Sequence, residues 1–178
     1  MRLLGVLLAF LLTQAPAVLP RAPYVTTPPD VVDRMLALVK VDSRDVVYDL
    51  GCGDGRIVIA AAQKFGARGV GVDIDPVRIA EATANARRAG VEKLVTFRLE
   101  DVLETDVSEA TVVTLYMLSA INVKLRPILT RDLPRGSRIV SHNFGMGDWE
   151  PDHVDTFRDA AGTTRTLYLW TTDGTIRP

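Results

Sequence analysis

Residues that build disulfides and metal sites are scarce in this chain. Its 178 residues include one cysteine, Cys52, and two histidines. A single cysteine excludes an intrachain disulfide and therefore says nothing about the redox compartment. The shortage of cysteine and histidine also argues against a zinc site, which needs several such ligands. The sequence therefore predicts no metal-binding residues.

Clusters of positive charge are also missing. The 21 lysine and arginine residues are nearly balanced by 22 aspartate and glutamate residues, for a formal net charge of −1. The chain has no block of basic residues and no alternation of basic with aromatic residues, the patterns that mark nucleic-acid surfaces. The sequence therefore predicts no nucleic-acid partner.

A long apolar run is missing as well, but the first twenty residues differ from the rest. Leu3 to Leu12 is almost wholly apolar, follows a single arginine, and precedes small residues at Ala15-Pro16-Ala17. This pattern is typical of a secretory signal, and the run is shorter than the roughly 20 apolar residues of a comfortable transmembrane helix. We therefore predict a signal peptide or membrane anchor at residues 1–20, a Pro-rich linker at residues 21–29 and one domain at residues 30–178.

This N-terminal segment also predicts a location. It indicates a protein that is membrane-associated through the segment or exported, with membrane contact in the first case. A single arginine does not fix the orientation of an anchor. If the start codon is assigned too early, a cytoplasmic location follows instead. The three locations stay open at this level.

Apolar periodicity divides the rest of the chain into helices and strands. Residues 31–39 repeat apolar side chains at helical spacing and predict a first, amphipathic helix. Apolar and β-branched runs then alternate with helical runs: strands near 45–50, 69–73, 94–99, 111–117 and 137–142, and helices near 54–66, 76–89 and 119–132. Such alternation predicts an α/β domain with a doubly wound, mainly parallel sheet. Residues 154–157 and 166–172 predict two more strands, joined as a hairpin.

A glycine-rich turn stands between the first of these strands and the following helix. It reads Asp49-Leu50-Gly51-Cys52-Gly53-Asp54-Gly55-Arg56. Glycines in such a turn adopt positive φ and let a ligand approach the backbone, while the helix N-terminus offers unpaired N–H groups. In a dinucleotide fingerprint, G-x-G-x-x-G, the third glycine would stand at Arg56. The turn therefore predicts a nucleoside ligand without a pyrophosphate, with an ordinary glycine-rich turn as the alternative.

Carboxylates end the next two strands. Asp73 lies about 20 residues after the glycine turn, where nucleotide-binding α/β folds place an acid that accepts hydrogen bonds from ribose hydroxyls. Asp75 precedes a proline and fits a helix N-cap better. The third strand ends in Glu100-Asp101. Because open α/β sheets bind ligands at the carboxyl ends of their strands, we expect these acids to share one site with Asp49.

The acidic-x-G-x-G-x-G pattern resembles motif I of the class I S-adenosylmethionine-dependent methyltransferases. The resemblance implies a Rossmann-like, seven-stranded sheet with an antiparallel closing strand, which the C-terminal hairpin would supply. It also implies S-adenosylmethionine as the cofactor, with the acid after the third strand at the adenine amino group. Asp101 is the preferred residue for that role, and Glu100 is the alternative.

Softer segments resemble one branch of these enzymes. They are Pro23–Pro28, Leu115–Leu118 with Asn122 and Leu125–Pro127, and Gly136–His142. The branch is the seven-strand protein-lysine methyltransferases related to the enzyme that modifies the ATP synthase c-subunit. The likeness implies that the acceptor is a lysine side chain of a protein, with a membrane-associated protein as one candidate. A small-molecule methyltransferase and a noncatalytic cofactor-binding module are the alternatives.

The resemblance implies two groups of site residues. The cofactor group comprises Tyr24, Thr27, Asp49, Gly51, Cys52, Gly53, Asp73, Ile74, Glu100 and Asp101. The acceptor group comprises Tyr116, His142 and Asn143. Tyr24 and Thr27 stand in a segment that departs from the Tyr-Val-Pro pattern of the relatives, so packing on the first helix is the alternative for Tyr24. Core packing is the alternative for Tyr116, and local backbone contacts for His142 and Asn143.

Overall fold

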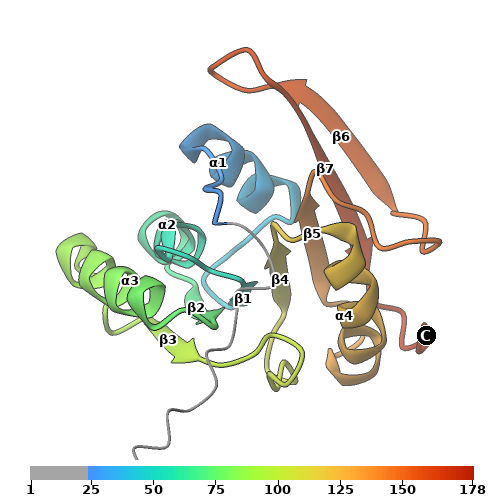
Figure 1. Cartoon of the computed structure of the whole chain (residues 1–178), viewed down its shortest axis with the longest axis horizontal. Helices are drawn as coiled ribbons and strands as arrows, with labels where there is room; N and C mark the ends of the chain where they lie inside the picture. Colours follow the sequence, from blue (N-terminus) through green and yellow to red (C-terminus); the bar gives the residue numbers. More distant parts are fainter. Residues whose placement is uncertain (1–23) are drawn as a thin grey trace, which may run out of the picture.

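Seven strands form one sheet in the order β3-β2-β1-β4-β5-β7-β6 (Figure 1). The computed structural model describes residues 24–178. Its strands are β1 (Val46–Leu50), β2 (Arg68–Asp73), β3 (Val95–Leu99), β4 (Val112–Leu115), β5 (Arg138–His142), β6 (His153–Arg158) and β7 (Thr164–Thr171). Its helices are α1 (Pro29–Leu38), α2 (Arg56–Phe65), α3 (Pro76–Ala89) and α4 (Ser119–Asp132). The predicted fold class, a mainly parallel seven-stranded α/β sheet with an antiparallel closing strand, is confirmed.

Helices cover both faces of the sheet. Helices α1, α2 and α3 lie on one face and α4 lies on the other (Figure 1). In β1, Val47 packs into the core on the α2 side, whereas Val46 and Tyr48 pack into the core on the α4 side. Successive side chains of a strand point to opposite faces, so a strand buried on both sides is apolar throughout. Such apolar runs, alternating with helical runs, predicted the doubly wound sheet.

The C-terminal hairpin inserts its second strand into the sheet. Strand β7 pairs antiparallel with both β5 and β6, so the earlier strand, β6, forms the edge. Leu167 and Trp170 of β7 are buried, whereas no residue of β6 is fully buried. The more apolar strand therefore takes the inner position, because burial of its side chains is favourable.

The connection from β3 to β4 contains no helix. Residues 100–111 form turns, and Val102, Val107 and Ala110 pack into the core on the α4 side. The connection begins beside the end of β2, where the N–H of Glu100 donates to the carbonyl oxygen of Asp73 at 3.1 Å. The acidic pair at the end of β3 therefore lies close to the acid at the end of β2.

The predicted location is wrong. None of the helices within residues 24–178 is long and apolar enough to cross a membrane, so the predicted membrane association is not supported. The run at residues 1–20, on which that prediction rested, lies outside the described residues. Residues 24–28, which the sequence assigns to the linker, have no regular secondary structure and lead directly into α1.

Candidate active site

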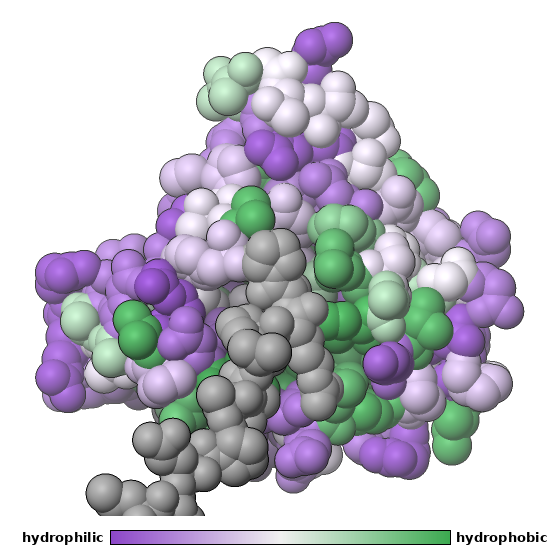
Figure 2. Space-filling model, in the orientation of Figure 1, coloured by the Kyte–Doolittle hydropathy of each residue, from purple (hydrophilic) through white to green (hydrophobic). Residues whose placement is uncertain are grey.

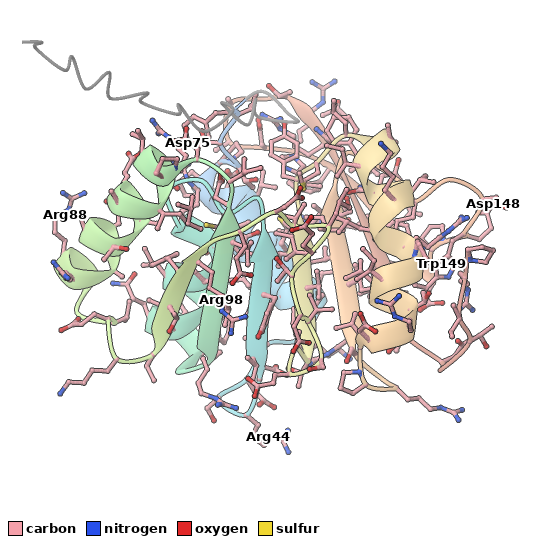
Figure 3. All side chains as sticks on the ribbon, turned by 60° about the horizontal axis from the view of Figure 1, so that its bottom comes forward. Arg44, Asp75, Arg88, Arg98, Asp148 and Trp149 are labelled. Atoms are coloured by element: carbon pink, nitrogen blue, oxygen red, sulfur yellow. The ribbon has the colours of Figure 1, made fainter. Side chains whose placement is uncertain are left out.

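A pocket opens at the edge of the sheet where the parallel strands end. It is lined by the glycine turn after β1, by the ends of β2, β3 and β4, and by residues 24–27, which we call the strap. In Figure 3 this edge faces upward and carries Asp75, whereas Arg44 marks the opposite edge. The predicted cofactor residues found in the lining are Tyr24, Thr27, Asp49, Gly51, Cys52, Gly53, Asp73, Ile74 and Asp101.

The glycine turn wraps around the end of β2. The N–H groups of Gly51 and Cys52 both donate to the carbonyl oxygen of Val72, at 2.8 and 2.9 Å. Gly51 and Gly53 have φ angles of +84° and +53°, which residues with a Cβ rarely adopt. A Cβ on Gly53 would lie 2.6 Å from Cε2 of Tyr24. The turn therefore needs glycine at position 53 both for its backbone shape and for its contact with the strap.

Two backbone N–H groups hold the carboxylate of Asp73. Its Oδ2 accepts from the N–H of Gly53 at 2.9 Å, and its Oδ1 accepts from the N–H of Asp75 at 3.0 Å. A carboxylate offers about four acceptor positions, so each oxygen keeps capacity for another donor. Asp75 itself caps α3 by accepting from the N–H of Val77 at 2.8 Å. Asp73 therefore stands fixed in the pocket wall with acceptor capacity left for a ligand.

Asp49 is a buried carboxylate in the same wall, 3% exposed. Burial raises its pKa to about 7, although the hydroxyl of Thr114 donates to it at 2.7 Å and opposes this rise. The carboxylates of Asp73 and Asp54 raise the pKa further. Burial also raises the pKa of the Cys52 thiol, which therefore stays protonated and is not a nucleophile. The charge of Asp49 is thus sensitive to what binds beside it.

Two arginines that line the pocket contact the strap and hold it in place. Nη1 of Arg56 donates to the carbonyl oxygen of Thr27 at 3.0 Å, while its Nη2 pairs with Asp54 at 2.6 Å. The guanidinium of Arg78 lies over the ring of Tyr24, 4.4 Å from its centroid, in a cation–π contact. Neither arginine is among the site residues that the sequence predicts. The position of Arg56 in the glycine motif could have marked it as a site residue. No sequence pattern marks Arg78, which lies on α3.

Tyr116, after β4, stands beside two aromatic residues from the end of β5. Its ring stacks on His142 with centroids 4.0 Å apart and lies 5.9 Å from the ring of Phe144. His142 is fully buried and does not line the pocket, but its Nδ1 lies 3.3 Å from Oγ1 of Thr27, which does. Burial, followed by the charge of Arg165, lowers the pKa of His142 to about 4, so the imidazole is neutral near pH 7. We call Tyr116, His142 and Phe144 the aromatic wall.

The surface at the start of α4 is partly apolar. Leu118 and Val123 are 41% and 36% exposed, and Val25 of the strap is 58% exposed. Figure 2 shows apolar residues gathered on the α4 side of this face, with hydrophilic residues around them. An acceptor that approaches Tyr116 from this side therefore meets a partly apolar surface.

Two further predicted site residues, Asn143 and Glu100, lie outside the pocket lining of residues 24–178. Asn143 has a φ of +63°. Its N–H donates to the carbonyl oxygen of Thr166 at 2.7 Å, and its Oδ1 accepts from the N–H of Thr166 at 3.0 Å. These two hydrogen bonds join the end of β5 to β7. Glu100 is exposed, and its carboxylate accepts from the hydroxyl of Thr105 at 3.4 Å. Of the acidic pair after β3, the residue beside the pocket is Asp101.

Comparison with known proteins identifies close relatives. Residues 49–153 match the family model described as the ANTKMT methyltransferase domain. A protein-lysine N-methyltransferase of Saccharolobus islandicus (strain REY15A) is 45% identical over 152 residues, which cover 85% of this chain and 94% of the relative. The human lysine N-methyltransferase of the ATP synthase c-subunit is 33% identical over 111 residues, which cover 62% of this chain and 47% of the relative.

Solved structures show the same similarity. A crystal structure described as an RNA methyltransferase from Salinibacter ruber, in complex with S-adenosylhomocysteine, is 55% identical with a TM-score of 0.80 and covers 86% of this chain and 97% of its own. An S-adenosylmethionine-dependent methyltransferase from Geobacter sulfurreducens, with the same ligand, is 25% identical with a TM-score of 0.59. The match covers 65% of this chain and 48% of the Geobacter chain.

The pocket lining fits the cofactor of these enzymes. S-adenosylmethionine carries a positively charged sulfur and an ammonium group, and aspartates line the pocket at positions 49, 54, 73, 75 and 101. The glycine turn lets a ligand reach the backbone, and Asp73 keeps acceptor capacity for ribose hydroxyls. The fold, the pocket and the relatives agree, and the chain therefore belongs to the ANTKMT methyltransferase domain family and is an S-adenosylmethionine-dependent methyltransferase.

Proposed function

We propose that this methyltransferase acts on the ε-amino group of a lysine in a protein. The observation that carries the proposal is the charge of the pocket. Five aspartates line it against two arginines, Arg56 and Arg78, which are already paired with Asp54 and Glu81. Such a lining disfavours a phosphate backbone as the acceptor. The name of the Saccharolobus islandicus relative, a protein-lysine N-methyltransferase, supports the same acceptor.

In this proposal the glycine turn and the strap bind the cofactor. Asp73 accepts from the ribose hydroxyls and Asp101 accepts from the adenine amino group. Asp49 would bind the cofactor from the end of β1, and Tyr24 and Thr27 would close over its methionine end. When bound, S-adenosylmethionine supplies an electrophilic methyl group on a positively charged sulfur. We assign residues 30–178 to the methyltransferase domain, with the strap as part of its site.

The aromatic wall is proposed to hold the acceptor side chain. A lysine ammonium must lose its proton before its nitrogen can attack a methyl group. Burial beside the uncharged rings of Tyr116 and His142 disfavours the charged ammonium and so lowers its pKa in the needed direction. The wall also excludes water and orients the amine for in-line attack, which are the main requirements of a methyl transfer.

RNA is the competing acceptor, because the Salinibacter ruber relative is described as an RNA methyltransferase. An RNA-binding surface places basic side chains where they can meet phosphates. The arginines that line this pocket are instead engaged with Asp54, Glu81 and the strap. The charge pattern therefore favours a lysine.

The test uses the full chain with S-adenosylmethionine labelled in its methyl group. Incubation with a protein extract and, separately, with total RNA should place label only in protease-sensitive material, as methyl-lysine by mass spectrometry. Asp73→Asn is the negative control. Label in RNase-sensitive material or in small molecules contradicts the lysine proposal but leaves the cofactor assignment standing. Cofactor binding without transfer to any acceptor would favour the noncatalytic module.

A further inference from the structure

We infer that Asn122 of α4 is a positioning residue that sets the acceptor side of the active site by holding the turn that carries Phe144. The inference rests on the proposed function, in which the aromatic wall holds the acceptor. Asn122 does not line the pocket and is completely buried. Its effect on methyl transfer must therefore pass through another residue.

The amide of Asn122 forms hydrogen bonds with the backbone just after β5. Its Nδ2 donates to the carbonyl oxygen of Phe144 at 3.1 Å and to Oγ of Ser141 at 3.1 Å, and it lies 3.5 Å from the carbonyl oxygen of Gly145. The hydroxyl of Ser141 donates to the same Phe144 carbonyl at 2.6 Å. Two buried side chains therefore hold one carbonyl group, and with it the position of the Phe144 backbone.

The opposite side of this turn is held by β7. Asn143 exchanges two hydrogen bonds with Thr166 and adopts a left-handed φ of +63°, a conformation that asparagine tolerates better than most residues. The turn between Ser141 and Phe144 is thus fixed from α4 and from β7. It carries His142 and Phe144 to their places beside Tyr116, at ring distances of 4.0 and 5.9 Å.

Helix α4 contacts the same loop one turn further along. Arg126 lies four residues after Asn122, so the two side chains share a face of the helix. Nη1 of Arg126 donates to the carbonyl oxygen of Met146 at 3.1 Å and pairs with Asp148. Figure 3 shows Asp148 and Trp149 beside α4. The helix therefore holds the loop at two points, and Asn122 is the point nearer Phe144.

Only the NH2 group of the Asn122 amide forms hydrogen bonds within residues 24–178. Its Oδ1 is buried and has no hydrogen-bond partner within residues 24–178. A buried polar atom without a partner costs stability. A stability cost of this kind is expected where a side chain serves the site, and here the useful half of the amide is the donor that holds Phe144.

The test is a double-mutant cycle on the full chain with Asn122→Leu and Phe144→Leu. Asn122→Leu keeps a similar volume but removes the donor. It should lower kcat/KM for the acceptor about tenfold, while the affinity for S-adenosylhomocysteine stays within about twofold of the wild-type value. If Asn122 acts through Phe144, the double variant should resemble Phe144→Leu alone, because effects that pass through one residue are not additive.

Matched variants separate positioning from general stability. Ser141→Ala removes the other donor to the same carbonyl and should give a smaller change of the same kind, and it serves if Asn122→Leu does not fold. Thr130→Val removes a buried hydroxyl of the same helix that bonds the carbonyl oxygen of Arg126 at 2.8 Å. It should lower thermal stability without changing acceptor kinetics. Additive effects in the cycle, or an equal loss of cofactor affinity, would overturn the inference.

The mutant cycle is measured with whichever acceptor the wild type labels. If that acceptor is RNA, the lysine proposal is wrong, but the cycle still tests the role of Asn122. If the wild type labels no acceptor, ring resonances of labelled phenylalanine provide the readout, with Phe144 assigned from Phe144→Leu. These resonances should shift or broaden in Asn122→Leu and stay unchanged in Thr130→Val. An unchanged Phe144 signal in Asn122→Leu rejects the inference.

Discussion

The hydroxyl of Thr27 lies 3.3 Å from Nδ1 of His142, a residue 115 positions further along the chain. Both side chains are buried, and the His142 ring stacks on Tyr116. The strap, which lines the pocket, therefore touches the aromatic wall directly. Displacement of the strap would remove a hydrogen bond from the ring that supports Tyr116, so the two parts of the site are coupled.

This contact predicts the effect of Thr27→Val, which keeps the shape of the side chain but removes the hydroxyl. A hydrogen bond of this kind contributes about 0.5–1.5 kcal/mol. We expect binding of S-adenosylhomocysteine to weaken by about 2- to 10-fold in isothermal titration, because the strap is less firmly held. Thr156→Val removes a hydroxyl on β6 that contacts Thr166 and should leave binding unchanged. Equal affinities of wild type and Thr27→Val would contradict the coupling.

Replacing Asp73 by asparagine should weaken cofactor binding strongly. The carboxylate is fixed by two backbone N–H groups, and asparagine lacks both the charge and one acceptor oxygen. Hydrogen bonds to charged groups contribute about 1.5–3 kcal/mol, so we expect the affinity for S-adenosylhomocysteine to fall by about 10- to 100-fold. Asp106→Asn, which changes an exposed carboxylate bonded to the N–H of Ser108, is the control and should bind normally.

Asp49 predicts a pH dependence of stability. In the folded protein it keeps its proton up to a pKa of about 7, whereas its ordinary pKa is 3.8. Between these values the folded state binds more protons than the unfolded state, so the free energy of unfolding falls as pH rises. Asp49→Asn cannot ionise and should remove this fall. Thermal unfolding of both proteins across this pH range tests the prediction, and parallel pH profiles would contradict it.

Cofactor binding should be linked to the same proton. The positive charges of S-adenosylmethionine favour the ionised form of Asp49 and lower its pKa. Binding near or below pH 7 should therefore release a proton and tighten as pH rises toward the pKa of about 7. Titration calorimetry in buffers of different ionisation enthalpy measures this release directly. It should be reduced in Asp49→Asn, and no difference from wild type would rule out Asp49 as the source.

Gly53→Ala should disturb the strap rather than the fold as a whole. The new Cβ would lie 2.6 Å from Cε2 of Tyr24, at a φ of +53°. Gly162→Ala is a matched control, because this glycine has a φ of +80° and a Cβ there would meet nothing within 4 Å. Both variants should lose about 1 kcal/mol of stability from backbone strain. Only Gly53→Ala should weaken cofactor binding, and equal binding by the two variants would contradict the contact between the turn and the strap.

Local patterns predicted most of the fold and most of the residues that line the pocket beside the glycine turn. The central strands β1, β2 and β4 were visible because they are buried on two faces and therefore largely apolar, and Asp73 was visible because it ends such a strand. Arg78 was missed because its contact with Tyr24 crosses from α3 to the strap. Asn143 was assigned to the acceptor group from its position after β5, but its side chain is engaged by Thr166 of β7, a pairing that depends on the order of the strands.

The sequence by itself determined the order of helices and strands, the glycine turn and the acids at the strand ends, because each follows from residues close together in the chain. Only the tertiary structure decided that β7 lies between β5 and β6, that Thr27 meets His142, and that Asn122 holds Phe144. The two side-chain contacts join residues 115 and 22 positions apart. They depend on how the apolar faces pack against one another, and no local pattern in the sequence records that packing.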